Sequence, residues 1–190
     1  MVGMNSISAP APAGGMRWLF WPLLVFTLVL MFLLGVVVDA PLKTPTAPQG
    51  IVSYELAGST AAAQNILDSW DQLAKLYAAF SLGLDYLYML CYGLVIGLAC
   101  AWAARRLGAR WHGVGVLGMV LAWGQAVAVL CDAIENIALL KMLPGGAAEP
   151  WPAVARWCAV VKFALVIAGL VYALAGFIFW LATRRARTVT

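Results

Sequence analysis

Hydrophobic positions along the chain gather into four long runs, and polar segments separate them. The runs cover about residues 18–38, 79–104, 114–140 and 153–182. Each is long enough to carry an α-helix through a bilayer core, which takes roughly 20 apolar residues for about 30 Å. The pattern therefore predicts an all-α, polytopic membrane protein, a bundle of four transmembrane helices.

The segment between the first two runs, residues 39–78, has a different pattern. Residues 41–50 contain three prolines and no apolar periodicity, which predicts a non-helical connector. Beyond it, an amphipathic helix that Ser59 or Thr60 could cap is predicted by apolar residues at helical spacing: Ile66, Leu67, Trp70, Leu73, Tyr77 and Phe80. This helix either lies on the membrane surface or folds over the bundle as a lid, and the sequence leaves both open.

The basic residues predict the orientation of the chain. Arg17, the arginines of the 105–110 loop and those of the 184–190 tail fall on one side of the four runs. Short loops rich in Lys and Arg stay in the cytoplasm. We therefore expect a multi-pass protein of a bacterial inner membrane with both termini cytoplasmic and the 39–78 loop external. Residues 1–16 are expected to be a disordered tail, and residues 17–183 a single transmembrane domain.

Composition removes several classes of function. With 64% hydrophobic and 11% charged residues among its 190, the chain is too apolar for a soluble domain. The net charge of +4 follows from the topology and indicates no nucleic-acid partner. The four cysteines lie in apolar runs without the spacing of metal ligands, so we predict neither a metal nor a cofactor. The expected partners are the bilayer, a lipid-like molecule, and a membrane protein or a second copy.

Three polar side chains interrupt the third run. Asp132, Glu135 and Asn136 stand at i, i+3 and i+4 and share one helical face, with Gln125 two turns back on the same stripe. An ionisable group inside a bilayer costs from roughly 3 to more than 10 kcal/mol, so such groups face a partner or a watery cavity. This face is therefore predicted to point inward.

The second and fourth runs carry matching groups. Asp85 lies on one stripe with Tyr88 and Tyr92, and Lys162 interrupts the fourth run. Counted from the external helix ends, Asp132 is about 13 Å deep and Lys162 about 16 Å deep. The simplest arrangement pairs Lys162 with one of the two acids of the third run. Three acids then face one lysine, and a proton, a cation, a ligand or water must compensate the excess charge.

These residues have two interpretations. One is an interhelical polar clamp. The other is a pocket in the outer half of the bilayer that binds or processes a lipid-like or amphipathic small molecule. In the pocket, the candidate acid and base groups are Asp85, Asp132 and Glu135, and the candidate ligand-binding residues are Asn136, Lys162, Gln125, Tyr88 and Tyr92. Whether the protein is an enzyme stays open.

A second functional hypothesis rests on the glycines. Gly93 and Gly97 form a GxxxG pattern, which lets a second helix approach closely, and Gly169 and Gly176 lie in the fourth run. Packing against another protein through these glycines would suit a non-catalytic subunit or assembly factor of a membrane complex. The sequence leaves this alternative open.

The acid and tyrosine pattern also suggests a resemblance. Asp85 with two tyrosines, followed by Asp-x-x-Glu-Asn at 132–136, resembles small bacterial integral membrane proteins to which no activity is assigned, so this resemblance implies no function. The layout of four spans with a long first external loop is similar to the sterol-isomerase and sigma-2-receptor superfamily. The histidine-bearing motif of that superfamily is absent from this chain.

Overall fold

The structure, a computed structural model, describes residues 15–187, and in that range every regular element is helical. The elements are α1 (Gly15–Phe32), η1 (Leu33–Val38), η2 (Ala40–Leu42), α2 (Ile51–Glu55), α3 (Thr60–Ser69), α4 (Gln72–Gly108), α5 (His112–Gly145) and α6 (Trp151–Arg187). The predicted disordered tail lies outside the described residues, except for the two with which α1 begins. The all-α prediction is confirmed.

Four helices are long and apolar enough to cross a membrane. They are Trp18–Val38, Gln72–Gly108, His112–Gly145 and Trp151–Arg184. At 1.5 Å per residue, the 37 residues of α4 extend over about 55 Å, well beyond the bilayer core of about 30 Å. The chain is therefore a multi-pass membrane protein whose helices project beyond the apolar layer.

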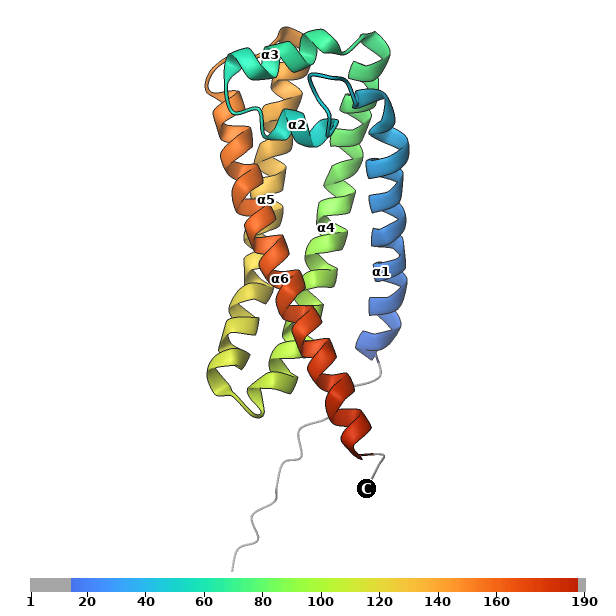
Figure 1. The fold of residues 1–190 in the computed structure, drawn as a ribbon, viewed down its shortest axis with the longest axis vertical. Helices are drawn as coiled ribbons and strands as arrows, with labels where there is room; N and C mark the ends of the chain where they lie inside the picture. The colour runs from blue at the N-terminus through green and yellow to red at the C-terminus, as the bar shows by residue number, and fades with distance from the viewer. Residues whose placement is uncertain (1–14, 188–190) are drawn as a thin grey trace, which may run out of the picture.

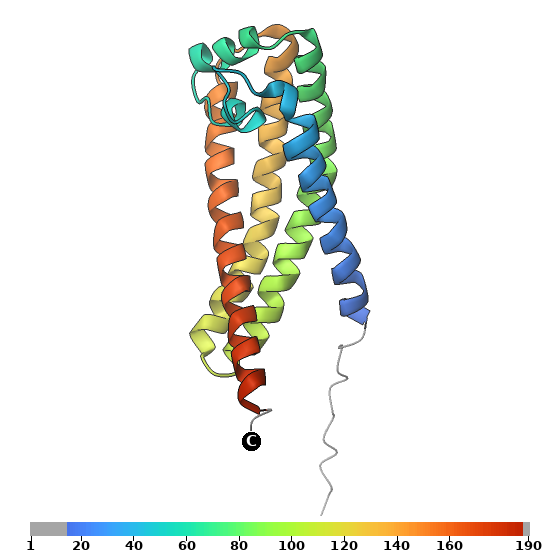
Figure 2. The same cartoon turned by 45° about the vertical axis from the view of Figure 1, so that its right-hand side comes forward.

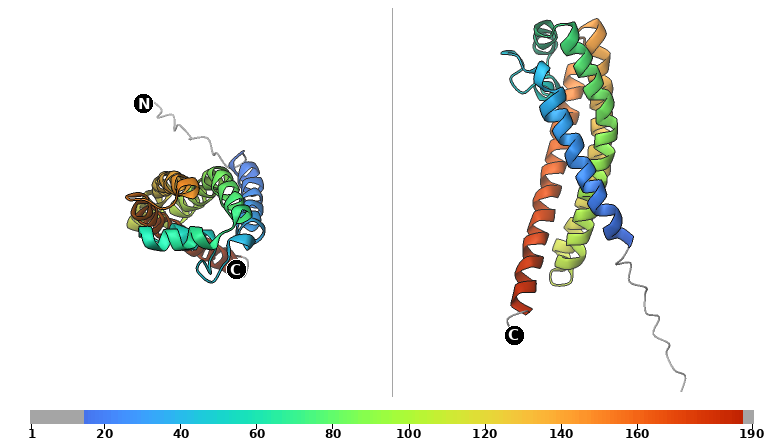
Figure 3. Two further views of the ribbon diagram at one scale, coloured as in Figure 1. Left: turned by 90° about the horizontal axis from the view of Figure 1, so that it is seen from above. Right: turned by 90° about the vertical axis from the view of Figure 1, so that its right-hand side faces the viewer.

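Three of the long helices make the centre of the bundle. α4, α5 and α6 pack on one another, and α1 packs along α4 (Figure 1). α1 begins and α6 ends at the same end of the molecule, as the turned view also shows (Figure 2). The opposite end is covered by residues 39–71, which we call the cap segment. Figure 3 shows α3 of this segment lying across the ends of the long helices.

The predicted amphipathic helix is divided in two. Ser59 caps α3 by accepting a hydrogen bond from Ala62 N at 3.3 Å, and α3 ends at Ser69. Trp70 is extended and buried, and its indole N–H donates to Leu42 O at 2.9 Å. Asp71 then caps α4 by accepting from Ala74 N at 2.7 Å. The second long helix consequently begins at Gln72, seven residues before the predicted start. The apolar spacing continues across this point, but the cap by Asp71 ends one helix and starts the next.

The cap segment is fixed by its own small core and by hydrogen bonds to α5 and to the α5–α6 connection. Tyr54 of α2 is 1% exposed, stacks edge-on against Trp70, and donates its hydroxyl to Leu139 O of α5. Gln64 of α3 accepts from Ala147 N at 2.8 Å in the α5–α6 connection. These contacts tie the cap segment to the ends of α5 and α6.

The glycines singled out in the sequence serve packing within this chain. A Cβ on Gly93 would lie 2.5 Å from Val129 Cγ2 of α5, and one on Gly169 would lie 2.6 Å from Gln125 Nε2. A Cβ on Gly176 would overlap Ala103 of α4. The absence of side chains at these positions lets the three central helices approach closely. These glycines therefore no longer support docking to another protein.

We expect Gly169→Leu to destabilise the bundle by about 1–3 kcal/mol, because its side chain would be forced between α4 and α5. The matched control is Gly83→Leu, since a Cβ on Gly83 has no neighbouring atom within 4 Å. Thermal unfolding in mild detergent, followed by circular dichroism, measures both. Equal midpoints for the two variants would contradict this packing of α6.

Candidate functional site: a buried acid–lysine cluster

Lys162 lies inside the bundle and meets three carboxyl groups. Its ammonium nitrogen is 2.9 Å from Asp132 Oδ1 and 3.0 Å from Glu135 Oε1, both on α5. It is also 3.5 Å from Glu55 Oε2 of α2. The lysine is 7% exposed, and the two α5 acids are 2% and 0% exposed. We call these four residues the acid–lysine cluster.

One hydrogen bond joins α4 to the cluster, and a second joins α4 to α5 beside it. The Tyr92 hydroxyl donates to Asp132 Oδ2 at 2.8 Å, so both oxygens of that carboxylate are engaged. Asn136 of α5 donates its side-chain amide to Asp85 Oδ2 at 2.7 Å. The acid–lysine cluster with Tyr92, and the Asp85–Asn136 pair beside it, thus gather polar groups from three long helices and the cap segment; we call all of these residues together the network.

Helical spacing explains why these side chains meet. Asp132, Glu135 and Asn136 stand on one face of α5, as the i, i+3, i+4 pattern requires, and all three are buried. On α4, Asp85 and Tyr92 are seven residues apart and face α5 together. Lys162 comes from α6, about 17 Å from the first residue of that helix. The three helices therefore place their polar groups at the same height along the bundle.

Glu55 is the member of the network that sequence reasoning missed. It lies in a short apolar stretch, IVSYEL at residues 51–56, where no periodic pattern sets it apart. In the structure α2 packs against both α5 and α6 and carries Glu55 to the lysine. One signal was available: a glutamate among apolar residues next to a tyrosine is unusual for a solvated loop. The pairing itself depends on how the cap segment folds back.

The network contains more acidic than basic groups. Three carboxyl groups contact the single ammonium group, and Asp85, which accepts from Asn136, adds a fourth carboxyl group beside them. Among the buried side-chain atoms of the described chain, Glu135 Oε2 has no hydrogen-bond donor, and Glu55 Oε2 meets only the Lys162 ammonium, at 3.5 Å. A buried acceptor without a donor costs about 1–3 kcal/mol. Protons or a bound donor must therefore offset part of the negative charge.

Burial also changes the acidity of Glu55, which lies outside the long helices. Desolvation raises the pKa of the Glu55 carboxyl above its ordinary value, while the nearby Lys162 ammonium opposes that rise. Asp132 adds to it by repulsion. The contact between the cap segment and the bundle is consequently sensitive to pH.

Two predicted ligand-binding residues lie beside the network rather than in it. Gln125 donates its amide to Leu121 O and Leu165 O and so joins α5 to α6 about two turns away. Tyr88 stacks on Tyr92, with ring centroids 5.3 Å apart, and is partly exposed. Within residues 15–187, no group of three His, Cys, Asp or Glu side chains could hold a metal ion.

We expect Lys162→Met to destabilise the protein by about 3–5 kcal/mol, because it leaves buried carboxyl groups without their cation. Lys75→Met is the control, since Lys75 lies on α4 outside the network, and its loss should cost no more than about 0.5 kcal/mol. Unfolding midpoints in detergent report the difference. Equal midpoints would show that the ammonium does not hold the cluster together.

The raised pKa of Glu55 predicts a pH effect with a defined sign. The folded state binds the proton of the Glu55 carboxyl more tightly than the unfolded chain does. The stabilisation that this proton gives is therefore complete below pH 4.5 and is lost as the pH rises through the higher pKa of the folded state. The stability of Glu55→Gln relative to wild type should therefore increase as the pH rises above 4.5. Glu149→Gln, at an exposed glutamate, should follow wild type throughout. A constant difference between Glu55→Gln and wild type would contradict the prediction.

Comparison with known proteins gives no further guide to this network. No family matches the chain, and neither a curated protein nor a solved structure is similar to it. Function is therefore inferred from the residues of the chain itself.

Proposed function

We propose that the acid–lysine cluster, together with Asp85, binds the polar head of a lipid-like or amphipathic small molecule. The observation that carries this proposal is the partial burial of Asp85 together with its incomplete hydrogen bonding. Its side chain is only partly buried, and Asn136 occupies one of its two oxygens. An acidic group at this depth of a membrane helix is costly unless it meets a partner. A molecule with an apolar body and a polar head supplies that partner from the bilayer.

The unsatisfied oxygens indicate which chemistry the head would carry. Glu135 Oε2 accepts no hydrogen bond within the described residues, and Glu55 Oε2 meets only the Lys162 ammonium, at 3.5 Å. A ligand head with hydrogen-bond donors, such as hydroxyl groups, therefore suits the network better than a further acceptor. Tyr88, partly exposed beside Tyr92, is the residue we assign to the body of the ligand.

The predicted acid and base groups have different access to such a ligand. Asp132 and Glu135 are almost fully buried and both bind Lys162. In this arrangement they hold the lysine in place, and Asp85 is the carboxyl group that a ligand would touch first. If the bound molecule is also processed, Asp85 is the candidate for proton transfer, and the α5 acids position the charge.

We infer that the cap segment faces the outside of a bacterial inner membrane and that both termini are cytoplasmic. The distribution of arginine supports this orientation, because Arg105 and Arg106 at the end of α4 and Arg110 in the loop after it lie at the end opposite the cap segment. In that orientation the acid–lysine cluster lies in the outer half of the bilayer. The α3 helix then serves as an external amphipathic cover.

Mass spectrometry of the protein purified in mild detergent tests the proposed binding. Asp85→Asn should lose the co-purified small molecule that wild type retains. Its fold should persist, because an amide oxygen can still accept the hydrogen bond from Asn136. Asp68→Asn, at an exposed position on α3, should retain the molecule. The absence of a bound molecule from all three proteins, or its presence in all three, would reject the proposal in favour of a structural clamp.

The alternative hypothesis, a non-catalytic subunit or assembly factor, stays a prediction. Its glycines pack within the chain, so it has lost the observation that motivated it. A second polypeptide that co-purifies at fixed stoichiometry, with no small molecule, would favour it over ligand binding.

A further inference from the structure

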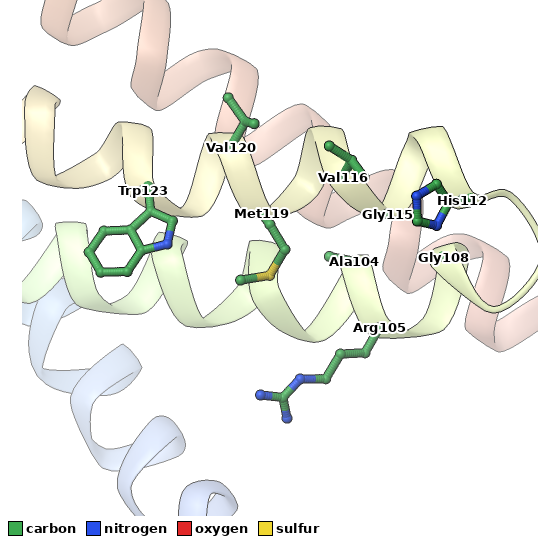
Figure 4. A pocket seen from close by; sticks show the side chains of 9 residues that line it. All are labelled: Ala104, Arg105, Gly108, His112, Gly115, Val116, Met119, Val120 and Trp123. Atoms are coloured by element: carbon green, nitrogen blue, oxygen red, sulfur yellow. The ribbon is translucent and has the colours of Figure 1, made fainter.

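An open groove runs between α4 and α5 at the end of the molecule opposite the cap segment (Figure 4). Its volume is about 610 Å³. The two helices touch at its closed end, where a Cβ on Gly108 would lie 3.1 Å from Gly115 Cα. Beyond this contact the groove continues along α5 toward the middle of the bundle. Its position is independent of the acid–lysine cluster.

The wall of the groove changes character along its length. Arg105 and His112 lie at the end near the α4–α5 loop, and Met119, Val120 and Trp123 lie farther along α5. Val120 is 61% exposed and Trp123 is 74% exposed, so these apolar surfaces have no protein neighbour to cover them. A basic end joined to an apolar trough matches a molecule with an anionic head and a hydrocarbon chain.

Arg105 differs from the basic residues beside it. Arg106 lies 5.7 Å from the ring centroid of Trp102, and Arg110 lies 5.2 Å from that of Trp111. Both guanidinium groups are thus placed over aromatic faces of this chain. Arg105 lines the groove instead. It is the guanidinium that a molecule in the groove would meet.

Among the residues that the structure describes, no acidic side chain forms an ion pair with Arg105. All eight acidic residues lie between residues 39 and 85 or between 132 and 149. Along α4, the nearest of them in sequence, Asp85, is about 30 Å away. A guanidinium at the edge of a bilayer without a protein anion is suited to bind a lipid phosphate.

We propose that this groove binds one anionic glycerophospholipid, with its phosphate at Arg105 and one acyl chain along Met119, Val120 and Trp123. His112 lines the same groove at the end near the α4–α5 loop. The Gly108–Gly115 contact closes the groove behind the head and so fixes where the chain enters. The site is separate from the one proposed for the acid–lysine cluster and does not depend on it.

The test uses the whole protein in nanodiscs that contain phosphatidylglycerol and phosphatidylcholine in equal amounts and with identical acyl chains. Native mass spectrometry then measures the ratio of the two lipids that stay bound. Wild type should retain phosphatidylglycerol in preference. Arg105→Gln should lower the ratio about five-fold, the factor expected for one basic residue near an anionic lipid. Arg106→Gln removes the same charge from the next residue and should leave the ratio unchanged.

A groove-filling variant separates the acyl chain from the head. Met119→Trp keeps Arg105 but occupies the trough, so it should reduce retention of both lipids. If Arg106→Gln lowers the ratio as much as Arg105→Gln, the attraction is a diffuse surface effect and the site does not exist. If Met119→Trp changes nothing, the arginine binds a bare anion and the lipid proposal is wrong. Unfolding midpoints equal to wild type show that each variant is folded.

Discussion

The ammonium group of Lys162 has to be neutralised inside a helix bundle, and much of the structure serves that requirement. A charge buried without a partner would cost many kcal/mol. α5 provides two carboxylates one turn apart, and α2 provides a third from the cap segment. Through these contacts a single side chain of α6 connects two other elements that are distant in sequence.

The carboxyl groups around Lys162 outnumber its single positive charge, and this excess of acidic groups is the main property of the site. The α4 carboxyl of Asp85 accepts from Asn136 beside the cluster, and the buried Glu135 Oε2 has no donor among the described residues. A purely structural ion pair would be expected to satisfy its polar atoms. The surplus of acceptors motivates the proposal of a ligand with hydrogen-bond donors.

Charge is also divided between the two ends of the molecule. The acidic residues belong to the cap segment, to the adjoining parts of α4 and α5, and to the α5–α6 connection, whereas the only charged residues from 105 to 110, at the end of α4 and just after it, are arginines. This division has one physical consequence at each end. Near the cap segment, acids compete for one lysine. At the other end, Arg105 lines an apolar groove and forms no ion pair with any residue that the structure describes.

The sequence by itself determined the helical class, the four long helices and the face of α5 that points inward. Hydrophobic run length and the i, i+3, i+4 spacing are local properties, so they can be recognised without knowledge of the fold. The same holds for the serine cap of α3. The sequence did not reveal that Asp71 would cap α4 and start it at Gln72, because the apolar spacing continues across the break between α3 and α4.

Only the tertiary structure decided which helices meet, and at what level. Glu55 joins Lys162 because the cap segment folds back between α5 and α6, a long-range event without a local pattern. Gln125 looked like a member of the polar stripe, yet two turns of helix carry it away from the cluster to the carbonyl of Leu165. The glycines could pack inside or outside the chain on sequence grounds alone. Close approach of α4, α5 and α6 placed them inside, because contact between helices depends on complementary surfaces from distant segments.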